Sequence, residues 1–174
     1  MKRRLQLALA AVAVGVVVVA LVASLGGPDS RPSRSGGGGE RIAPLRLTTL
    51  TGDRIALPRR RLGALFLTVS SCISCIASGQ ALGEVKARFG DRVDAAWIGI
   101  DPSDPPEQVK ARRASMGNPP YDFAIDRTGT VADRFQVTAL GTTIVYDGDN
   151  RIVAKLIEPT EDELLAAFRT AGAS

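Results

Sequence analysis

Two cysteines, Cys72 and Cys75, are the only cysteines of the chain, and they stand two residues apart within SSCISCIAS, residues 70–78. A pair at this spacing can be a redox couple, half of a metal site or a structural cross-link. A cross-link that closes so short a loop stabilises a fold by only about 2 kcal/mol on the chain-entropy estimate, against about 3 kcal/mol for a loop of about fifteen residues. This small stabilisation favours redox or metal chemistry for the pair.

The chemistry depends on where the pair lies in the local structure. The apolar run ALFLTVS, residues 64–70, predicts a buried central strand, and the pattern after it predicts a helix from the cysteines to Gly90. A cysteine at a helix N-terminus faces unpaired backbone N–H groups and the positive end of the helix dipole, which stabilise a thiolate. The thiolate is the nucleophile of disulfide exchange. We therefore expect Cys72 to attack, with a pKa below the roughly 8.5 of a free thiol, and Cys75, one turn inside the helix, to resolve the mixed disulfide.

The rest of the chain alternates between strand and helix patterns. The stretch LRLTTLTGDRIAL, residues 45–57, predicts a hairpin, and VDAAWIGI, residues 93–100, predicts a second buried strand. Asp104 is expected to cap a helix with Pro105 at its first position and Glu107 closing a capping box. Further elements are expected as strands at YDFAID, TTIVYD and RIVAKLI, a short helix near TVADRF and a last helix capped by Thr160 with Glu163. Because the last two strands form a hairpin, the sequence predicts an α/β fold with a mixed sheet.

The N-terminal part of the chain has a different composition. Residues 5–25 form an uncharged apolar run that is long enough, at about 1.5 Å per residue, to cross the roughly 30 Å of a bilayer core as a helix. Basic residues at positions 2–4 precede the run, and the positive-inside rule keeps them in the cytoplasm. We expect an N-terminal membrane anchor, residues 1–25, a flexible Gly/Ser/Pro linker, residues 26–40, and a domain outside the cytoplasm, residues 41–174, where disulfides persist. A cleaved signal peptide is the alternative for the apolar run.

The charge distribution argues against nucleic acid as a partner. The chain has 22 Lys and Arg against 18 Asp and Glu, a net charge of +4. The whole excess lies in residues 1–41, and residues 42–174 carry equal numbers of each sign. Binding to phosphates requires a basic surface, and the predicted domain lacks that excess.

The order of elements, with CxxC between a buried strand and the next helix, resembles the thioredoxin fold over residues 42–172. Two branches of that superfamily compete. The entry LRLTTLTGDRIALPRRRLGALFLTVSSCISC and the ending YDGDNRIVAK resemble membrane-anchored thiol–disulfide oxidoreductases of the TlpA type. The stretch IGIDPSDPPEQVKARRASMG is more similar to the Sco copper-delivery family.

The TlpA-type resemblance implies a function and a set of site residues. It implies exchange with cysteine-containing extracytoplasmic proteins and with a membrane or extracytoplasmic redox partner, without a cofactor. Gly141 stands where the family has a cis-proline that faces the cysteines, so Gly141 and Thr142 are expected to form the substrate-facing loop, and the glycine is expected to open the site. The family often has an acidic residue that accepts the proton of the second cysteine, and strand 64–70 and the turn after Cys75 contain none.

The Sco resemblance keeps a metal carrier as the alternative. That family holds copper with two cysteines and a histidine, and this chain has no histidine. Cys72 and Cys75 could still bind Cu(I), a soft ion that accepts thiolate ligands, with Met116 as a conceivable third ligand. No other metal site is expected. A binding module that kept the fold without the chemistry is the third alternative.

Overall fold

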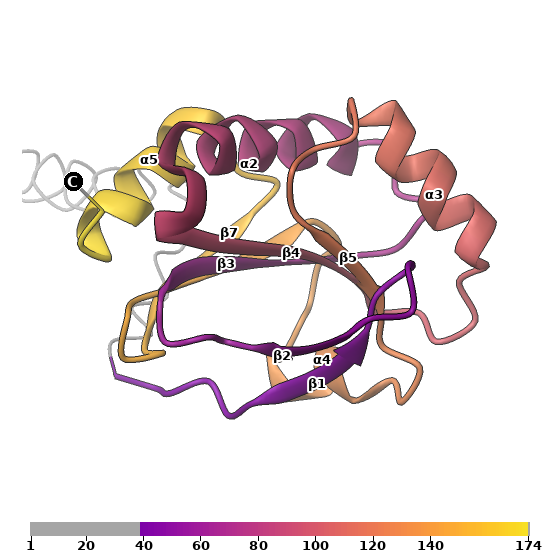
Figure 1. The fold of residues 1–174 in the computed structure, drawn as a ribbon, viewed down its shortest axis with the longest axis horizontal. Helices are drawn as coiled ribbons and strands as arrows, with labels where there is room; N and C mark the ends of the chain where they lie inside the picture. The colour runs from indigo at the N-terminus through magenta and orange to yellow at the C-terminus, as the bar shows by residue number, and fades with distance from the viewer. Residues whose placement is uncertain (1–38, 174) are drawn as a thin grey trace, which may run out of the picture. The chain divides into compact units, whose positions relative to one another are not determined.

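The computed structural model describes residues 39–173, which build a central sheet covered on both faces (Figure 1). The predicted membrane anchor and nearly all of the predicted linker lie outside the described residues. Within residues 39–173 no helix is both long and apolar enough to cross a membrane. The predicted boundaries at residues 25 and 40 stay predictions.

The main sheet has five strands in the order β5-β4-β3-β6-β7. The central strand β3 pairs in parallel with β4 on one side and antiparallel with β6 on the other, so the sheet is mixed, as predicted. The five strands are β3 (Leu62–Thr68), β4 (Val93–Gly99), β5 (Asp122–Ile125), β6 (Thr142–Tyr146) and β7 (Ile152–Ile157). The predicted N-terminal hairpin is present as a separate antiparallel pair, β1 (Leu45–Thr48) and β2 (Arg54–Leu57).

The two faces of the sheet are covered by different elements. In Figure 1, α2 (Cys75–Phe89), α3 (Pro106–Ser115) and α5 (Glu161–Thr170) lie on one face, and the β1–β2 hairpin and α4 (Thr130–Arg134) lie on the other. Alternate side chains of β3 enter the two cores, since Phe66 packs with the α2 side while Leu65 and Leu67 pack with the hairpin side. Because both faces of the sheet are covered, both sets of alternating side chains of β3 are buried, which explains its continuous apolar run.

The helix ends test the predicted caps. Gly90 ends α2 with a positive φ of 57°, and Thr160 and Glu163 form the predicted capping box of α5, so both predictions are confirmed. The predicted cap at Asp104 is wrong, because α3 begins at Pro106 after Pro105 and no side chain caps it. The Asp104 carboxylate binds Ser70 instead, in the loop before the cysteines.

Candidate active site

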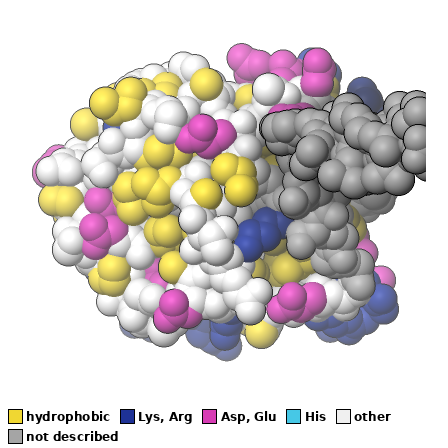
Figure 2. Space-filling view, turned by 180° about the vertical axis from the view of Figure 1, so that it is seen from behind, with side chains coloured by type: hydrophobic (Ala, Val, Ile, Leu, Met, Phe, Trp, Pro, Cys, Tyr) yellow, Lys and Arg dark blue, Asp and Glu magenta, His cyan; other side chains and the backbone are white. Residues whose placement is uncertain are grey.

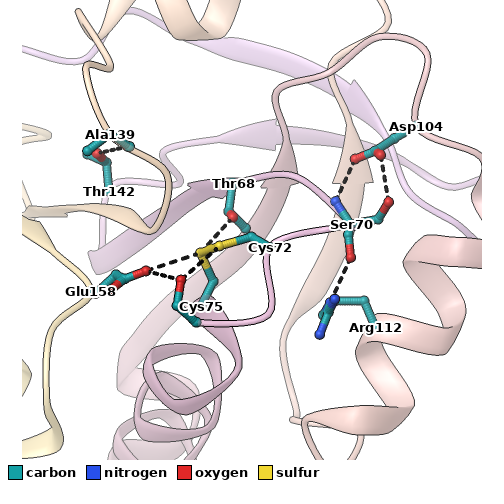
Figure 3. The surroundings of a disulfide bond; sticks show 10 residues. Thr68, Ser70, Cys72, Cys75, Asp104, Arg112, Ala139, Thr142 and Glu158 are labelled. Atoms are coloured by element: carbon teal, nitrogen blue, oxygen red, sulfur yellow. Dashed lines mark hydrogen bonds between the residues drawn. A yellow bond between two sulfur atoms is a disulfide. The ribbon is translucent and has the colours of Figure 1, made fainter.

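The two cysteines form a disulfide at the start of α2, with their Cα atoms 5.5 Å apart (Figure 3). Cys75 is the first residue of the helix and Cys72 lies in the turn before it, so the prediction that Cys75 lies one turn inside the helix is wrong. Cys72 is 8% exposed and Cys75 is 2% exposed. Cys72 is therefore the more exposed residue of the two.

Two oxygens approach the buried sulfur of Cys75. The hydroxyl of Thr68, the last residue of β3, lies 3.1 Å from this sulfur. The carboxylate of Glu158, just after β7, has Oε1 at 3.8 Å from the same sulfur and accepts a hydrogen bond of 2.5 Å from Ser74 (Figure 3). The Ser74 hydroxyl is also 3.5 Å from the sulfur of Cys72. A carboxylate thus lies beside the pair, although none stands near it in the sequence.

The expectation that Gly141 opens the site is wrong in one respect. Gly141 does lie beside the disulfide, since a Cβ there would be 3.2 Å from the sulfur of Cys75. The space is not open, however, because the same Cβ would be 2.7 Å from Cγ of Glu158. Gly141 has φ of 74°, which proline cannot adopt, and among the described residues the only cis peptide precedes Pro58.

Thr142, the second residue expected on the substrate-facing loop, is turned into the fold. Its side chain is buried, and its hydroxyl donates a hydrogen bond of 2.7 Å to the carbonyl oxygen of Ala139. The structure thus brings Gly141 to the disulfide and uses the Thr142 side chain to shape the loop that carries it.

On the other side of the disulfide, the loop before Cys72 is held by residues around α3. We call Ser70, Asp104 and Arg112 the α3 clamp. The buried carboxylate of Asp104 accepts hydrogen bonds from the backbone N–H of Ser70 at 2.8 Å and from its hydroxyl at 2.6 Å. Nε of Arg112 donates to the carbonyl oxygen of Ser70 at 2.8 Å (Figure 3). The clamp therefore fixes the backbone two residues before the first cysteine.

Large apolar side chains are exposed next to the residues that contact the disulfide. Ile73 lies between the cysteines and is 76% exposed. Leu140 precedes Gly141 and is 41% exposed, and Ile157 precedes Glu158 and is 58% exposed. Figure 2 shows hydrophobic side chains gathered on the left half of one face of the described residues. Ile73, Leu140 and Ile157 are thus exposed apolar residues next in sequence to residues at the disulfide.

The described residues do not form the copper-binding set of the Sco family. The chain has no histidine, and the sulfur of Met116 fills the space that a Cβ on Gly79 would need, inside the core. The two cysteine sulfurs and a carboxylate oxygen of Glu158 lie within 4.8 Å of one another, with the sulfurs joined in the disulfide.

No protein-family model matches the chain. A protein of Streptomyces lividans described as mercury resistance operon ORF3 is 24% identical over 145 residues, which cover 81% of this chain and 77% of that protein. The thioredoxin domain of a thiol–disulfide oxidoreductase from Bacteroides vulgatus superimposes with a TM-score of 0.66 at 17% identity, covering 76% of this chain and 95% of that one. The fold is thioredoxin-like.

Two other solved structures agree with this assignment. A thiol–disulfide oxidoreductase from Bacteroides fragilis has a TM-score of 0.64 at 16% identity over 75% of this chain and 98% of that one. DsbF of MTB has a TM-score of 0.65 at 16% identity over 73% of this chain and 94% of that one. These neighbours share the thioredoxin-like fold with this chain.

Glu158 is the site residue that the sequence did not indicate. It lies 83 positions after Cys75, and only the pairing of β6 with β7 brings it to the disulfide. Thr142 pairs with Ile157 in that hairpin, so the next pair outward is Gly141 with Glu158, joined by a hydrogen bond of 3.0 Å. Extending the register of the predicted hairpin by one pair would have found it, although a register shift near the turn makes that extension uncertain in the sequence alone.

Proposed function

We propose that this protein is a membrane-anchored, extracytoplasmic thiol–disulfide oxidoreductase that exchanges disulfides with cysteine-containing proteins. The observation that supports it most directly is the Cys72–Cys75 disulfide at the start of α2, with Cys72 the more exposed residue and exposed apolar residues next in sequence to Cys72 and to the residues that contact the disulfide. A thiolate at Cys72 gains from the positive end of the α2 dipole. The exposed apolar side chains favour a protein partner over a small thiol.

The site supports exchange in two steps. The thiolate of Cys72 attacks one sulfur of a partner disulfide, which breaks the partner's S–S bond and forms a mixed disulfide. Cys75 then attacks the sulfur of Cys72, which reforms the disulfide seen here and releases the partner in its dithiol form. The reverse sequence oxidises a partner dithiol, and the reduction potentials of the two proteins set the direction.

The two single cysteine variants test this order. Each is expressed as the full chain, quenched with acid, alkylated and examined on non-reducing gels. Cys75→Ser is expected to accumulate mixed disulfides with partner proteins through Cys72, because the resolving thiol is missing. Cys72→Ser is expected to accumulate almost none, because Cys75 is buried. The double variant controls for adducts through other routes.

Sco-like Cu(I) delivery gives the opposite result. Each single variant would then lose Cu(I) binding to a similar extent and neither would accumulate protein adducts. Stoichiometric Cu(I) binding by the reduced wild type alone, without adducts in either variant, would replace the oxidoreductase proposal. The absence of both adducts and metal binding would favour a binding module.

The proposed location rests on the charge pattern of the N-terminus and has its own test. A reporter that is active only outside the cytoplasm, fused after Ser174, is expected to be active because the basic residues precede the apolar run. An inactive fusion would place the domain in the cytoplasm and remove the argument for stable disulfides.

A further inference from the structure

We propose that Glu158 is the general acid–base catalyst of the exchange, removing the proton of Cys75 when this thiol attacks and returning it when this sulfur leaves. The inference rests on the proposed function, and it concerns a residue outside the CxxC segment. The residue just after β7 would thereby supply the proton acceptor that the sequence around the cysteines lacks.

The position of the carboxylate is the first argument. Oε1 of Glu158 lies 3.8 Å from the sulfur of Cys75. In the disulfide this sulfur carries no proton, so the contact becomes a hydrogen bond only after reduction. Catalytic hydrogen bonds are often long in resting structures and shorten in the reacting complex. The other oxygen at this sulfur is the Thr68 hydroxyl, and an alcohol hydroxyl is too weak a base to take the proton of a thiol, whereas a carboxylate can act as a general base.

The backbone gives the second argument. Glu158 has φ of 45°, in a region that residues other than glycine enter rarely and at a cost. Its N–H donates to the carbonyl oxygen of Gly141, which has φ of 74°. A side chain on Gly141 would collide with the Glu158 side chain. The glycine thus leaves the space through which the Glu158 side chain reaches the disulfide.

The hydrogen bond from Ser74 gives the third argument. The Ser74 hydroxyl donates to Oε1 of Glu158 at 2.5 Å and holds the carboxylate over the loop between the cysteines. The groups that face Glu158 and Cys75 are then Ser74 between the cysteines, Thr68 from β3 and the backbone of Gly141 before β6. The other carboxylate near the site, Asp104, accepts two hydrogen bonds from Ser70 and is committed to the clamp.

The step balances as follows for reduction of a partner disulfide. The mixed disulfide joins Cys72 to the partner, and the first partner sulfur has left as a thiolate and taken a proton from water. The proton of Cys75 moves to Glu158 and the Cys75 thiolate attacks the sulfur of Cys72. The second partner sulfur leaves as a thiolate and takes that proton from Glu158. Two electrons pass from the cysteine pair to the partner, and the carboxylate is regenerated.

The test is a single-turnover reaction of the reduced full chain with glutathione disulfide, quenched with acid and alkylated, with the products followed by mass. We expect Glu158→Gln to accumulate the glutathione adduct of Cys72, because resolution slows by about 100-fold near neutral pH, as is typical for the loss of a general base. The defect should shrink at alkaline pH, where Cys75 loses its proton to solvent. Glu107→Gln, which neutralises an exposed glutamate on α3, is the matched control and should resemble the wild type.

A second variant distinguishes loss of the general base from a defect in folding. Glu158→Asp keeps a carboxylate with a side chain shorter by one methylene, and we expect an intermediate rate with the pH dependence of the wild type. If Glu158→Gln slows resolution equally at every pH, or if its rate equals that of the wild type, the inference is wrong while the exchange activity stands. If the wild type forms neither adduct nor disulfide with glutathione disulfide, and Cys75→Ser traps no protein adducts, the proposed function fails first.

Discussion

Two carboxylates approach the disulfide loop from opposite sides and have different surroundings. Asp104 is buried, and both of its oxygens accept hydrogen bonds from Ser70. Glu158 is exposed, is held by the Ser74 hydroxyl and reaches the sulfur of Cys75. Because Asp104 is buried and both of its oxygens are hydrogen-bonded, this carboxylate serves to hold the loop before Cys72 in place. Exposure and contact with a reacting atom leave the second available for proton transfer.

The same contrast separates the two segments that carry these residues. The α3 clamp and the start of α2 are tied by buried polar contacts, including the hydroxyl of Tyr121, which donates to the carbonyl oxygen of Gly79 at 2.8 Å. Beyond the last strand pair, the end of the β6–β7 hairpin is held by the backbone bond from Glu158 to Gly141 and by the exposed bond from Ser74 to the Glu158 carboxylate. We therefore expect substitutions in the first segment to change stability and those in the second to change the rate of exchange.

The largest effect on stability is expected for Asp104→Ala. The substitution leaves the backbone N–H of Ser70 buried without an acceptor and removes two bonds to a charged group. We expect the free energy of unfolding to fall by about 3 kcal/mol, measured in urea through the fluorescence of the single tryptophan, Trp97. Asp101→Ala is the matched control, because Asp101 also accepts from the N–H and hydroxyl of a serine, Ser103, but at the surface.

Asp101→Ala should lower stability much less than Asp104→Ala. Equal losses would mean that burial does not distinguish the two carboxylates. A loss of exchange by Asp104→Ala under conditions in which the variant stays folded would give the clamp a direct part in the chemistry.

Gly141→Ala is expected to have the next largest effect and to act on both stability and rate. An L-residue with a positive φ costs about 1–2 kcal/mol, and the new methyl group would also displace the Glu158 side chain. We therefore expect slower resolution of the mixed disulfide in addition to the loss of stability. Gly52→Ala is the control, since Gly52 has φ of 91° and no atom within 4 Å of the added Cβ. Gly52→Ala should lose stability without losing rate, and a normal rate in Gly141→Ala would contradict the role of Glu158.

A smaller effect is expected for Tyr121→Phe, which removes the bond that ties α2 to the core. Loss of one hydrogen bond should cost about 1 kcal/mol. Tyr146→Phe should cost nothing or stabilise slightly, because the buried Tyr146 hydroxyl has no partner among the described residues. Equal costs would mean that the bond to Gly79 contributes nothing.

The two tyrosines also predict a pH dependence. Burial raises the pKa of both Tyr121 and Tyr146 well above the usual value of about 10. The unfolded chain therefore releases these protons first, so their contribution to stability is present below about pH 10 and is lost as the pH rises further. Unfolding in urea across this range should show the decline in the wild type and a shallower decline in each phenylalanine variant.

The sequence correctly predicted the features that depend only on residues close to one another along the chain. The capping box of Thr160 and Glu163, three residues apart, and the apolar run of β3 need no information from distant parts of the chain. Asp104 was wrongly expected to cap α3, because a local rule does not include Ser70, which lies 34 positions earlier and takes both oxygens. Glu158 was missed for the same reason. The start of α2 was displaced by three residues from the expected position, and helix ends are the least fixed feature of such predictions.

A small effect on stability, with the most specific effect on chemistry, is expected for Ser74→Ala. Ser74 is exposed, so the free energy of unfolding should change by no more than about 0.5 kcal/mol. Its hydroxyl holds the Glu158 carboxylate and lies 3.5 Å from the sulfur of Cys72. Without this hydroxyl the carboxylate is still present but loses its fixed position, so resolution should slow by less than in Glu158→Gln.

The double variant Ser74→Ala/Glu158→Gln decides whether the two residues act together. If Ser74 works only by holding the carboxylate, the double variant should resolve the mixed disulfide at the rate of Glu158→Gln alone, because no general base remains to be positioned. If the two losses multiply instead, Ser74 acts independently, most directly through its contact with the sulfur of Cys72. The first result would mean that proton transfer depends on Glu158, at the end of the β6–β7 hairpin, and that the α3 clamp holds the loop before Cys72 in place. The second would place part of the chemistry in the loop between the cysteines.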